Sequence, residues 1–274
     1  MEASLHIQTA RRAGKTILQN AYYTTPFKVA NVTEDKSKQA LRLMLMTSSP
    51  GILDGDVYDM KIGVAANCKL ELQTQSFQRL FTMKAGASQT FEVRLEEGAS
   101  FLYLPHPTVP HETSDFVAKN KIYLSAGCSL IWGEVLTCGR KLNGEEFKFT
   151  RYHNITEVFL SNKLVIKENL LLRPSFVDVS AIGQLEGYTH QASLIYINET
   201  AAVSTIVSEL TDLLSTYKEI EFGVSALPVN GVIVRLLGYK GEQLHSIQKQ
   251  IAAYLTTIND LKIQKDTEAG VYAS

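Results

Sequence analysis

Apolar and polar residues alternate in short stretches from the N-terminus to about Ser175. The clearest stretches cover residues 40–46, 69–74, 91–95 and 147–152. A period of two places one face of a strand against a core and the other in water. Antiparallel sheets commonly show this alternation, whereas buried parallel strands are apolar throughout. The pattern therefore predicts a mainly β body, about residues 1–200, built from antiparallel strands with Gly-, Asn- and Asp-containing turns between them.

A weak internal repeat runs through this body. Its pattern is apolar-x-apolar, two residues, a turn residue, two residues, then apolar-x-apolar, and its starting positions lie 31 and 29 residues apart. The three copies are Ile62, Val64, Asn67, Leu70 and Leu72; Val93, Leu95, Gly98, Phe101 and Tyr103; and Ile122, Leu124, Gly127, Leu130 and Trp132. A two-strand unit cannot bury its apolar face alone, so stacked units would form a sandwich or a β-helix-like solenoid. Ordinary hairpins at similar spacing are the alternative interpretation.

The C-terminal part has a different periodicity. Apolar residues over 203–217 and again over 244–258 follow the spacing of one helical face. Two short strand candidates, 219–225 and 232–237, lie between them and are joined by an Asn-Gly turn. We predict a helix–strand–strand–helix end, about residues 201–260, on a single domain that spans residues 1–274. The polar tail after about Asp260 is expected to fray.

Composition narrows the class of protein. The chain has 274 residues and a formal net charge of −1, so it lacks the basic surplus typical of nucleic-acid-binding domains. No stretch approaches the length of a membrane span, and the N-terminal residues lack the pattern of a signal peptide. The three cysteines are widely spaced and odd in number, unlike a secreted disulfide framework. We expect a cytoplasmic protein that binds neither nucleic acid nor membrane.

Candidate metal ligands are few. Cys68 and Cys128 occupy the repeat position that Ala99 fills in the second copy, which indicates a small buried residue. No C-x-x-C pair is present to form a closed zinc site. His106 and His111 flank a Pro-Thr-Val-Pro segment and could hold nickel through imidazole nitrogen. The prolines explain the segment equally well as a strand edge or loop.

Catalytic motifs are missing from the sequence. It contains no G-x-S-x-G, no Walker-type phosphate loop and no G-x-G-x-x-G. Asp54, Asp56 and Asp59 could bind a hard cation, or they could accept main-chain hydrogen bonds in a turn. Arg140 and Glu145 bracket another turn, as structural pairs often do. These observations favour a binding or scaffold protein over an enzyme, although scattered catalytic residues are difficult to detect in a sequence.

Four segments, in register over most of the chain, carry a family resemblance. Residues 49–56 (SPGILDGD) are similar to a PGG-x-x-x-GD turn, and 72–80 (LQTQSFQRL) to a TTQ strand. Residues 101–110 (FLYLPHPTVP) and the W-G-E…G-R…G-E-E-F block of 132–147 complete the pattern. Together they resemble the UreD/UreH family of urease accessory proteins, most of all its Helicobacter-type UreH members.

The resemblance implies more than the residues show by themselves. It implies a β-helix-like stack of strands with a few helices, no enzymatic activity, and a complex with UreF-type and UreG-type proteins. That complex, which the resemblance also expects to dimerise, would dock on apo-urease and deliver nickel without binding it tightly. We hypothesise that Asp54, Asp56, Glu134, Arg140 and Glu145 line the nickel path. The alternative is a stand-alone module that stores or senses nickel through His106 and His111.

Overall fold

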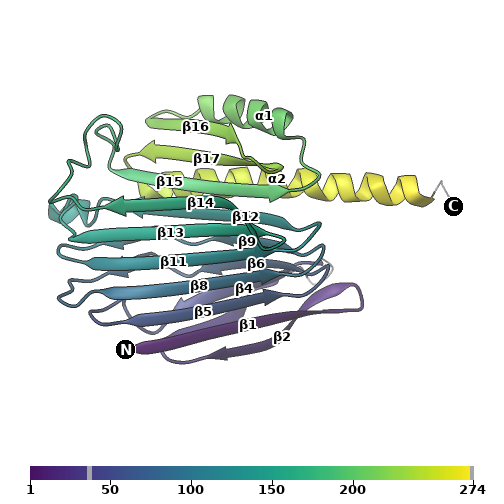
Figure 1. The fold of residues 1–274 in the computed structure, drawn as a ribbon, viewed down its shortest axis with the longest axis horizontal. Coiled ribbons are helices and arrows are strands. Elements are labelled where there is room, and N and C mark those ends of the chain that lie inside the picture. The colour runs from purple at the N-terminus through teal and green to yellow at the C-terminus, as the bar shows by residue number, and fades with distance from the viewer. Residues whose placement is uncertain (36–38, 272–274) are drawn as a thin grey trace.

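The protein consists of two facing β-sheets and a layer of two helices outside the second sheet (Figure 1). The computed structural model describes the main chain of residues 1–35 and 39–271, and the side chains as far as residue 259. No helix in those two ranges is both long enough and apolar enough to cross a membrane. The mainly β fold with two C-terminal helices is confirmed.

The first sheet contains seven strands in the order β14-β13-β11-β8-β5-β1-β2. Their bounds are β1 Glu2–Arg12, β2 Lys15–Tyr23, β5 Val57–Val64, β8 Ala87–Leu95, β11 Asp115–Leu124, β13 Arg151–Leu160 and β14 Lys163–Leu172. The five strands from β1 to β13 pair in parallel, and only the hairpin partners at the two edges, β2 and β14, are antiparallel.

The second sheet follows the order β16-β17-β15-β12-β9-β6-β4-β3, with the short strands β7 and β10 beside it. Its strands are β3 Phe27–Asn31, β4 Leu41–Thr47, β6 Lys69–Thr74, β7 Gln78–Leu80, β9 Ser100–Leu104, β10 Thr108–Pro110, β12 Ser129–Thr137, β15 His190–Asn198, β16 Ile220–Ala226 and β17 Gly231–Gly238. The run β4-β6-β9-β12 is parallel, and the strands after β12 are antiparallel.

The internal repeat is a stacked coil in which each copy places one strand in each sheet. Ile62 and Ile122 both pair with Val93 in the first sheet, so the three copies lie in register. In the second sheet, Leu72 and Trp132 both pair with Tyr103. The solenoid interpretation is therefore confirmed, and the units are arches between sheets rather than hairpins.

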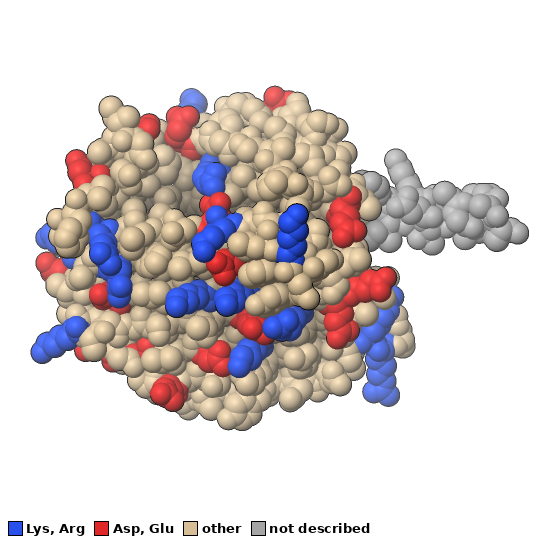
Figure 2. Space-filling model, in the orientation of Figure 1, with Lys and Arg blue, Asp and Glu red and all other residues tan. Residues whose placement is uncertain are grey.

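The expected antiparallel direction is wrong for the strands inside the coil. Alternation arises here for another reason, because each sheet has one face on the shared core and one face outside it. On the outer face of the first sheet, Lys, Arg, Asp and Glu side chains are interspersed (Figure 2). Ion pairs lie on this face, both along one strand, as in Lys61–Asp59 (3.0 Å), and between neighbouring strands, as in Lys167–Glu157 (2.9 Å). The alternation of apolar and polar residues therefore indicates which side chains are buried, and it does not indicate whether neighbouring strands are parallel or antiparallel.

The arches turn at the positions that the repeat marks. Asn67, Gly98 and Gly127 all have left-handed backbone, with φ of 56°, 66° and 68°. Asn and Gly adopt this conformation at lower cost than other residues. The next residue in each arch, Cys68 in the first and Cys128 in the third, points into the core, which confirms the small buried position.

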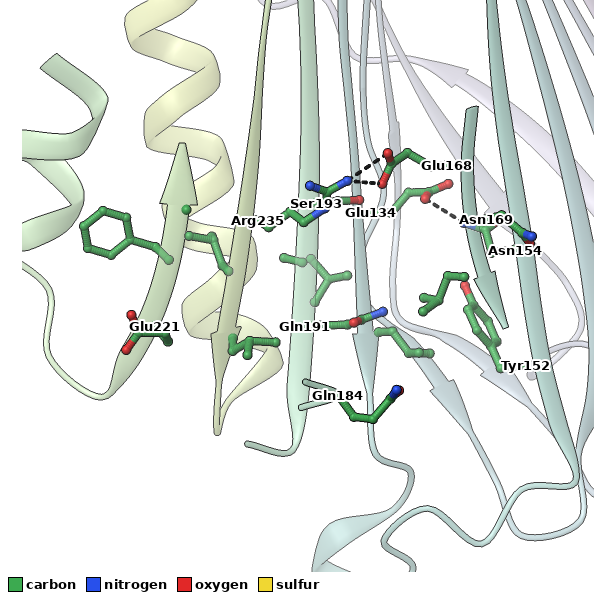
Figure 3. Close-up of a pocket in the computed structure, with 18 residues that line it drawn as sticks. Glu134, Tyr152, Asn154, Glu168, Asn169, Gln184, Gln191, Ser193, Glu221 and Arg235 are labelled. Atoms are coloured by element: carbon green, nitrogen blue, oxygen red, sulfur yellow. Dashed lines mark hydrogen bonds and ion pairs between the residues drawn. The ribbon is translucent and has the colours of Figure 1, made fainter. Parts of the chain in front are cut away.

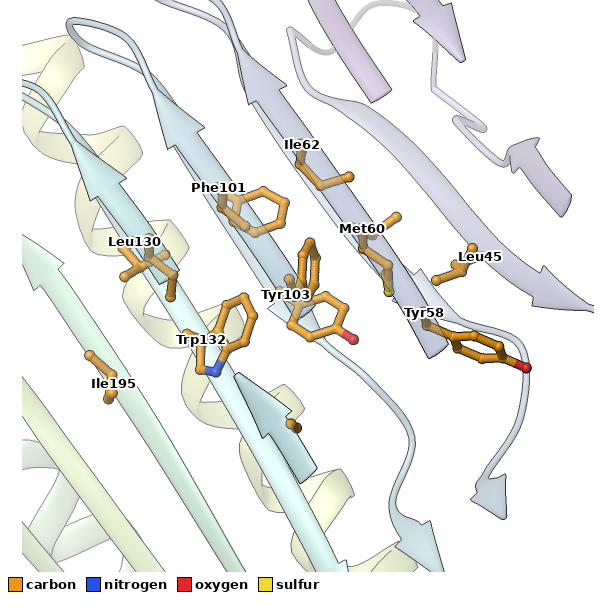
Figure 4. Close-up of a cluster of buried hydrophobic side chains, with 14 of the residues drawn as sticks. Leu45, Tyr58, Met60, Ile62, Phe101, Tyr103, Leu130, Trp132 and Ile195 are labelled. Atoms are coloured by element: carbon orange, nitrogen blue, oxygen red, sulfur yellow. The ribbon is translucent and has the colours of Figure 1, made fainter. Parts of the chain in front are cut away.

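Two apolar cores result from this arrangement. The larger core lies between the sheets and contains the aromatic residues Phe91, Phe101, Tyr103 and Trp132. Figure 4 shows the last three of them in this core. Trp132 lies 4.7 Å from Tyr103 and 5.4 Å from Phe91 between ring centroids. The smaller core lies between the outer face of the second sheet and the helices α1 Val203–Ser215 and α2 Gly241–Val271.

Two element boundaries differ from the predictions. The strand expected at 147–152 begins only at Arg151, because a short 3-10 helix, η1 Lys141–Asn143, and a loop precede it. Phe147 there has a φ of 52°, which an extended strand excludes, and Phe149 enters the core from the loop. Helix α2 continues to Val271, beyond the end expected near residue 260, since the polar tail is rich in good helix formers.

Candidate functional site

A cavity of about 430 Å³ opens where the two sheets diverge (Figure 3). Strands β13 and β14 of the first sheet form one wall, and β12, β15, β17 and β16 of the second form the other. Arg235 on β17 donates two hydrogen bonds to the Glu168 carboxylate on β14, at 2.8 and 2.7 Å. This ion pair connects the sheets on the cavity wall. We call this space the large cavity.

Glu134 on β12 is the acidic group at the inner end of the large cavity. Its Oε1 accepts a hydrogen bond from Asn120 Nδ2 at 3.1 Å, and its Oε2 accepts one from Asn154 Nδ2 at 2.6 Å. Asn120 also donates to Thr156 Oγ1 at 2.9 Å. The first sheet thus presents neutral polar groups to Glu134. Among the described residues, Glu134 forms no ion pair with Lys or Arg.

The environment of Glu134 favours its protonated form. Burial raises the pKa of the Glu134 carboxyl, and hydrogen bonds from Asn154 and Thr156 act in the opposite direction. The negative charge of Glu168 also raises this pKa. A buried carboxylate with neutral partners would be stabilised by an incoming cation, because the cation would supply the missing counter-charge.

The W-G-E motif connects this carboxylate to helix α2. A side chain at Gly133 would place its Cβ 2.4 Å from Leu104 Cδ2 and 3.1 Å from Gln248 Oε1. The missing side chain lets Gln248 of α2 reach the sheet, where its Nε2 donates to the carbonyl oxygens of Glu134 at 3.1 Å and Ser193 at 2.8 Å. The three residues thus have separate roles. Trp132 packs in the core, Gly133 leaves room for α2 to pack on the sheet, and Glu134 faces the cavity.

Two smaller cavities adjoin the large cavity through shared lining residues. The middle cavity, about 40 Å³, shares Glu134, Tyr152 and Asn154 with the large cavity. The distal cavity, about 80 Å³, shares Tyr103 and His106 with the middle cavity and extends to the turn at 49–52. We call the three together the cavity line. Its lining includes residues of all four motifs that carried the family resemblance.

The aspartates of the first motif hold their own turn. Asp54 Oδ1 accepts hydrogen bonds from the main-chain N–H groups of Lys84, Ala85 and Gly86, at 2.9, 2.8 and 3.1 Å. The bond from Ala85 is the main reason that the pKa of Asp54 lies below its usual value.

Asp56 is buried and bonded on both carboxylate oxygens. Its Oδ2 accepts hydrogen bonds from Leu53 N at 2.9 Å and from the Tyr58 hydroxyl at 3.3 Å, and its Oδ1 lies 3.0 Å from the Met1 amino group. Asp59 lies apart from both aspartates, on the outer face with Lys61. The turn interpretation describes Asp54 and Asp56, and Asp56 touches the cavity line only through Tyr58.

Arg140 and Glu145 form a second structural corner. Arg140 Nε donates to Glu145 Oε2 at 2.8 Å, and Nη2 donates to Oε1. Glu145 Oε2 also accepts from the main-chain N–H of Glu112 at 3.2 Å. The hydrogen bonds from Arg140 are the leading cause that lowers the pKa of Glu145. His111 is buried beside this pair and against Phe81, at 4.8 Å between ring centroids.

His106 has different neighbours from His111. Thr74 Oγ1 lies 3.1 Å from His106 Nδ1 and accepts the His106 main-chain N–H at 2.8 Å. The ring of His245, from the first turns of α2, lies 4.7 Å from the His106 ring between centroids. The structure therefore pairs His106 with a residue that sequence reasoning missed. No local signal connects these histidines, because only the docking of α2 on the second sheet brings them together.

The predicted path residues are thus divided. Glu134 lies on the cavity line, whereas Asp54, Asp56, Arg140 and Glu145 do not line the large, middle or distal cavity. Within the described side chains, no three or more His, Cys, Asp or Glu residues gather closely enough to hold a metal ion.

Fold and cavities together define a class of protein: a two-sheet β-solenoid with an apolar core, a helical layer and a partly polar cavity between the sheets. A family model described as UreD urease accessory protein matches residues 1–265. The chain therefore belongs to the UreD family of urease accessory proteins, and it has a role in urease maturation.

Individual relatives agree with this assignment. The chain is 46% identical over 248 residues to the urease accessory protein UreD of Flavobacterium johnsoniae, which covers 90% of each protein. It is 33% identical over 251 residues to the UreD of Acetivibrio thermocellus, covering 91% of this chain and 95% of that protein. The UreD of Actinobacillus pleuropneumoniae serotype 5b is 33% identical over 263 residues, covering 93% of this chain and 97% of the relative.

Proposed function

We propose that this chain is a non-enzymatic cytoplasmic scaffold that helps to insert nickel into apo-urease. It acts in a complex with UreF-type and UreG-type accessory proteins. Its family membership supports a role in urease maturation. The sequence contains no Walker-type phosphate loop, so a nucleotide-driven step would fall to the UreG-type partner.

The cavity line carries the finer part of this proposal. Nickel, as cargo, enters the large cavity past the Glu168–Arg235 pair and passes Glu134 towards His106 and the turn at 49–52. Oxygen atoms of carboxylates, amides and water exchange at a hydrated divalent ion more readily than a closed set of thiolates would. Glu134, whose pKa is raised by burial, must release any bound proton before it binds the cation. These oxygen ligands therefore favour a brief contact with nickel over tight storage of the ion.

The partner part of the proposal is tested by co-expression. The chain is produced with UreF-type and UreG-type proteins and analysed by size-exclusion chromatography, and urease activity is measured in cells that lack this chain. Co-elution, and urease activity that returns when the gene is restored, are the expected results. Separate elution and full urease activity without the chain would contradict the proposal.

The route is tested by Glu134→Ala in the same complementation assay. The matched control is Glu92→Ala, which removes a carboxylate from the outer face, where Glu92 pairs with Arg94 at 2.7 Å. We expect Glu134→Ala to lower urease activation at least tenfold with complex formation retained, while Glu92→Ala activates normally. Normal activation by a folded Glu134→Ala variant would refute the role of Glu134 and leave the scaffold role standing.

A further inference from the structure

A separate cavity of about 330 Å³ opens at the first turn of α2. It is lined by the ends of β12 and β15, by Val109 of β10 and by residues 240–243. Phe77, which also lines the distal cavity, completes one wall. We call this space the helix-start cavity. The proposed nickel route does not pass through it.

Gly241 allows α2 to begin close to the ends of two strands. A Cβ there would lie 3.2 Å from Thr137 Cγ2 and 3.4 Å from both His190 Cδ2 and Pro107 Cβ. Thr137 and His190 pair with each other across β12 and β15. Because Gly241 has no side chain, the helix starts with its main chain against these strand ends.

The first turn of α2 has main-chain donors to spare. The first hydrogen bond of the helix runs from Leu244 N to the carbonyl oxygen of Lys240, at 3.2 Å. The N–H groups of Gly241, Glu242 and Gln243 find no acceptor among the described residues. Unsatisfied N–H groups and the helix macrodipole give a helix N-terminus a partial positive charge, which favours a bound anion.

His190 adds a buried donor to this helix end. The residue is 7% exposed, and its Nδ1 lies 2.8 Å from Thr189 Oγ1. The opposite ring edge, which carries Cδ2 and Nε2, lies towards Gly241, and Nε2 has no partner in the part of the chain that the structure describes. Burial, followed by the charge of Lys141, lowers the pKa of His190 to about 4, and Glu146 acts in the opposite direction. The neutral ring still donates through Nε2–H when the Thr189 hydroxyl donates to Nδ1.

We propose that the helix-start cavity binds a phosphate group through the first-turn N–H groups of α2, His190 Nε2–H and the Lys240 ammonium group. A phosphate has several acceptor oxygens, so it can use donors that converge from a helix end and from a strand. Phe77 and Val109 leave an apolar wall beside these donors. The organic part of a phosphate ester would pack on that wall, whereas free phosphate would leave it to water.

The charged side chains around the helix-start cavity set its affinity. Lys240 and Glu242 both line the cavity and are exposed, so one attracts a phosphate and the other repels it. Lys141 lies near His190 but is paired with Glu146 at 3.5 Å, which offsets its charge. The remaining attraction comes from the helix end and the uncharged donors. We therefore expect modest affinity that weakens as salt is added.

The test is titration calorimetry of the purified full chain with sodium phosphate and with phenyl phosphate, at pH 7 and low salt. We expect Lys240→Gln to weaken binding by about fivefold and Glu242→Gln to tighten it by about as much, because each removes one nearby charge. His190→Phe keeps a ring but removes its donor, and should weaken binding by at least about tenfold. Lys249→Gln is the matched control, since Lys249 is exposed on α2 outside the lining. It should bind phosphate like the unmodified chain.

The two probes distinguish the sources of the phosphate group. Tighter binding of phenyl phosphate would identify an ester that uses the apolar wall, and equal binding would identify free phosphate. Binding of neither probe would overturn the proposal. Equal weakening by Lys240→Gln and Lys249→Gln would also overturn it, because attraction to α2 would then be unspecific. Both substitutions are on exposed side chains, so this comparison holds even if His190→Phe fails to fold.

Discussion

Gly139 provides a sharp test of how the G-R…G-E block holds the fold. Its φ is 124°, and an added Cβ would lie 2.5 Å from the Glu145 carbonyl oxygen and 2.9 Å from that of Pro110. Both contacts are with main-chain atoms, which cannot rotate away as a side chain can. Gly144 in the same block also has positive φ, at 73°, but its Cβ would meet nothing within 4 Å. Both substitutions place alanine at positive φ, but Gly139→Ala carries the larger conformational cost as well as the steric one, because a φ of 124° lies outside the left-handed region that alanine can adopt.

The expected magnitudes follow from these two contributions. Alanine in left-handed backbone costs about 1–2 kcal/mol, which is the whole expectation for Gly144→Ala. The close contacts at Gly139 add about 1–3 kcal/mol, by analogy with overpacked cores. The melting temperature of Gly139→Ala should then lie roughly 2–12 °C below that of Gly144→Ala. Trp132, the only tryptophan and 2% exposed, reports unfolding by fluorescence. Equal melting temperatures for the two variants would refute the steric argument.

Two further predictions concern buried groups. Because burial raises the pKa of Glu134, the folded chain holds its proton to a higher pH than the unfolded chain, so stability falls as pH rises through the two pKa values. Glu134→Gln should flatten the dependence of the urea midpoint on pH above the ordinary glutamate pKa of about 4, and an unchanged slope would contradict the buried-acid account. Cys68→Ala should cost about 1 kcal/mol, as expected for one buried atom without a metal or disulfide. A loss above about 4 kcal/mol would show that the thiol has another role.

The repeat was the most informative feature of the sequence. Its five marked positions predicted the register of three coils, because a stacked coil needs an apolar residue at each inward position and a left-handed residue at each turn. Strand direction was not predictable from the same residues. Val93 points into the core, and its neighbours along the strand point outward. This holds whether the strands of its partners Ile62 and Ile122 run parallel or antiparallel to its own.

The candidate site was predictable only in part. Glu134, which the family resemblance singled out, lies in the lining of the large and middle cavities. Asp56 and Glu145 looked equally suitable, but their main-chain partners are visible only in three dimensions. The meeting of His106 with His245 depends on the docking of α2, and no spacing within the sequence encodes it.

The most direct test of the central claim is the nickel content of urease made in cells whose copy of this chain carries Ser193→Trp. Ser193 lines the large cavity on β15, opposite the polar groups of the first sheet (Figure 3), so the indole would fill the route without removing a charge. Ser225→Trp, on the exposed strand β16 and outside that lining, is the matched control. If nickel passes through the cavity line, urease from Ser193→Trp cells lacks nickel while the accessory complex still forms and Ser225→Trp cells load urease fully. Full nickel content with a folded Ser193→Trp chain would contradict the internal route.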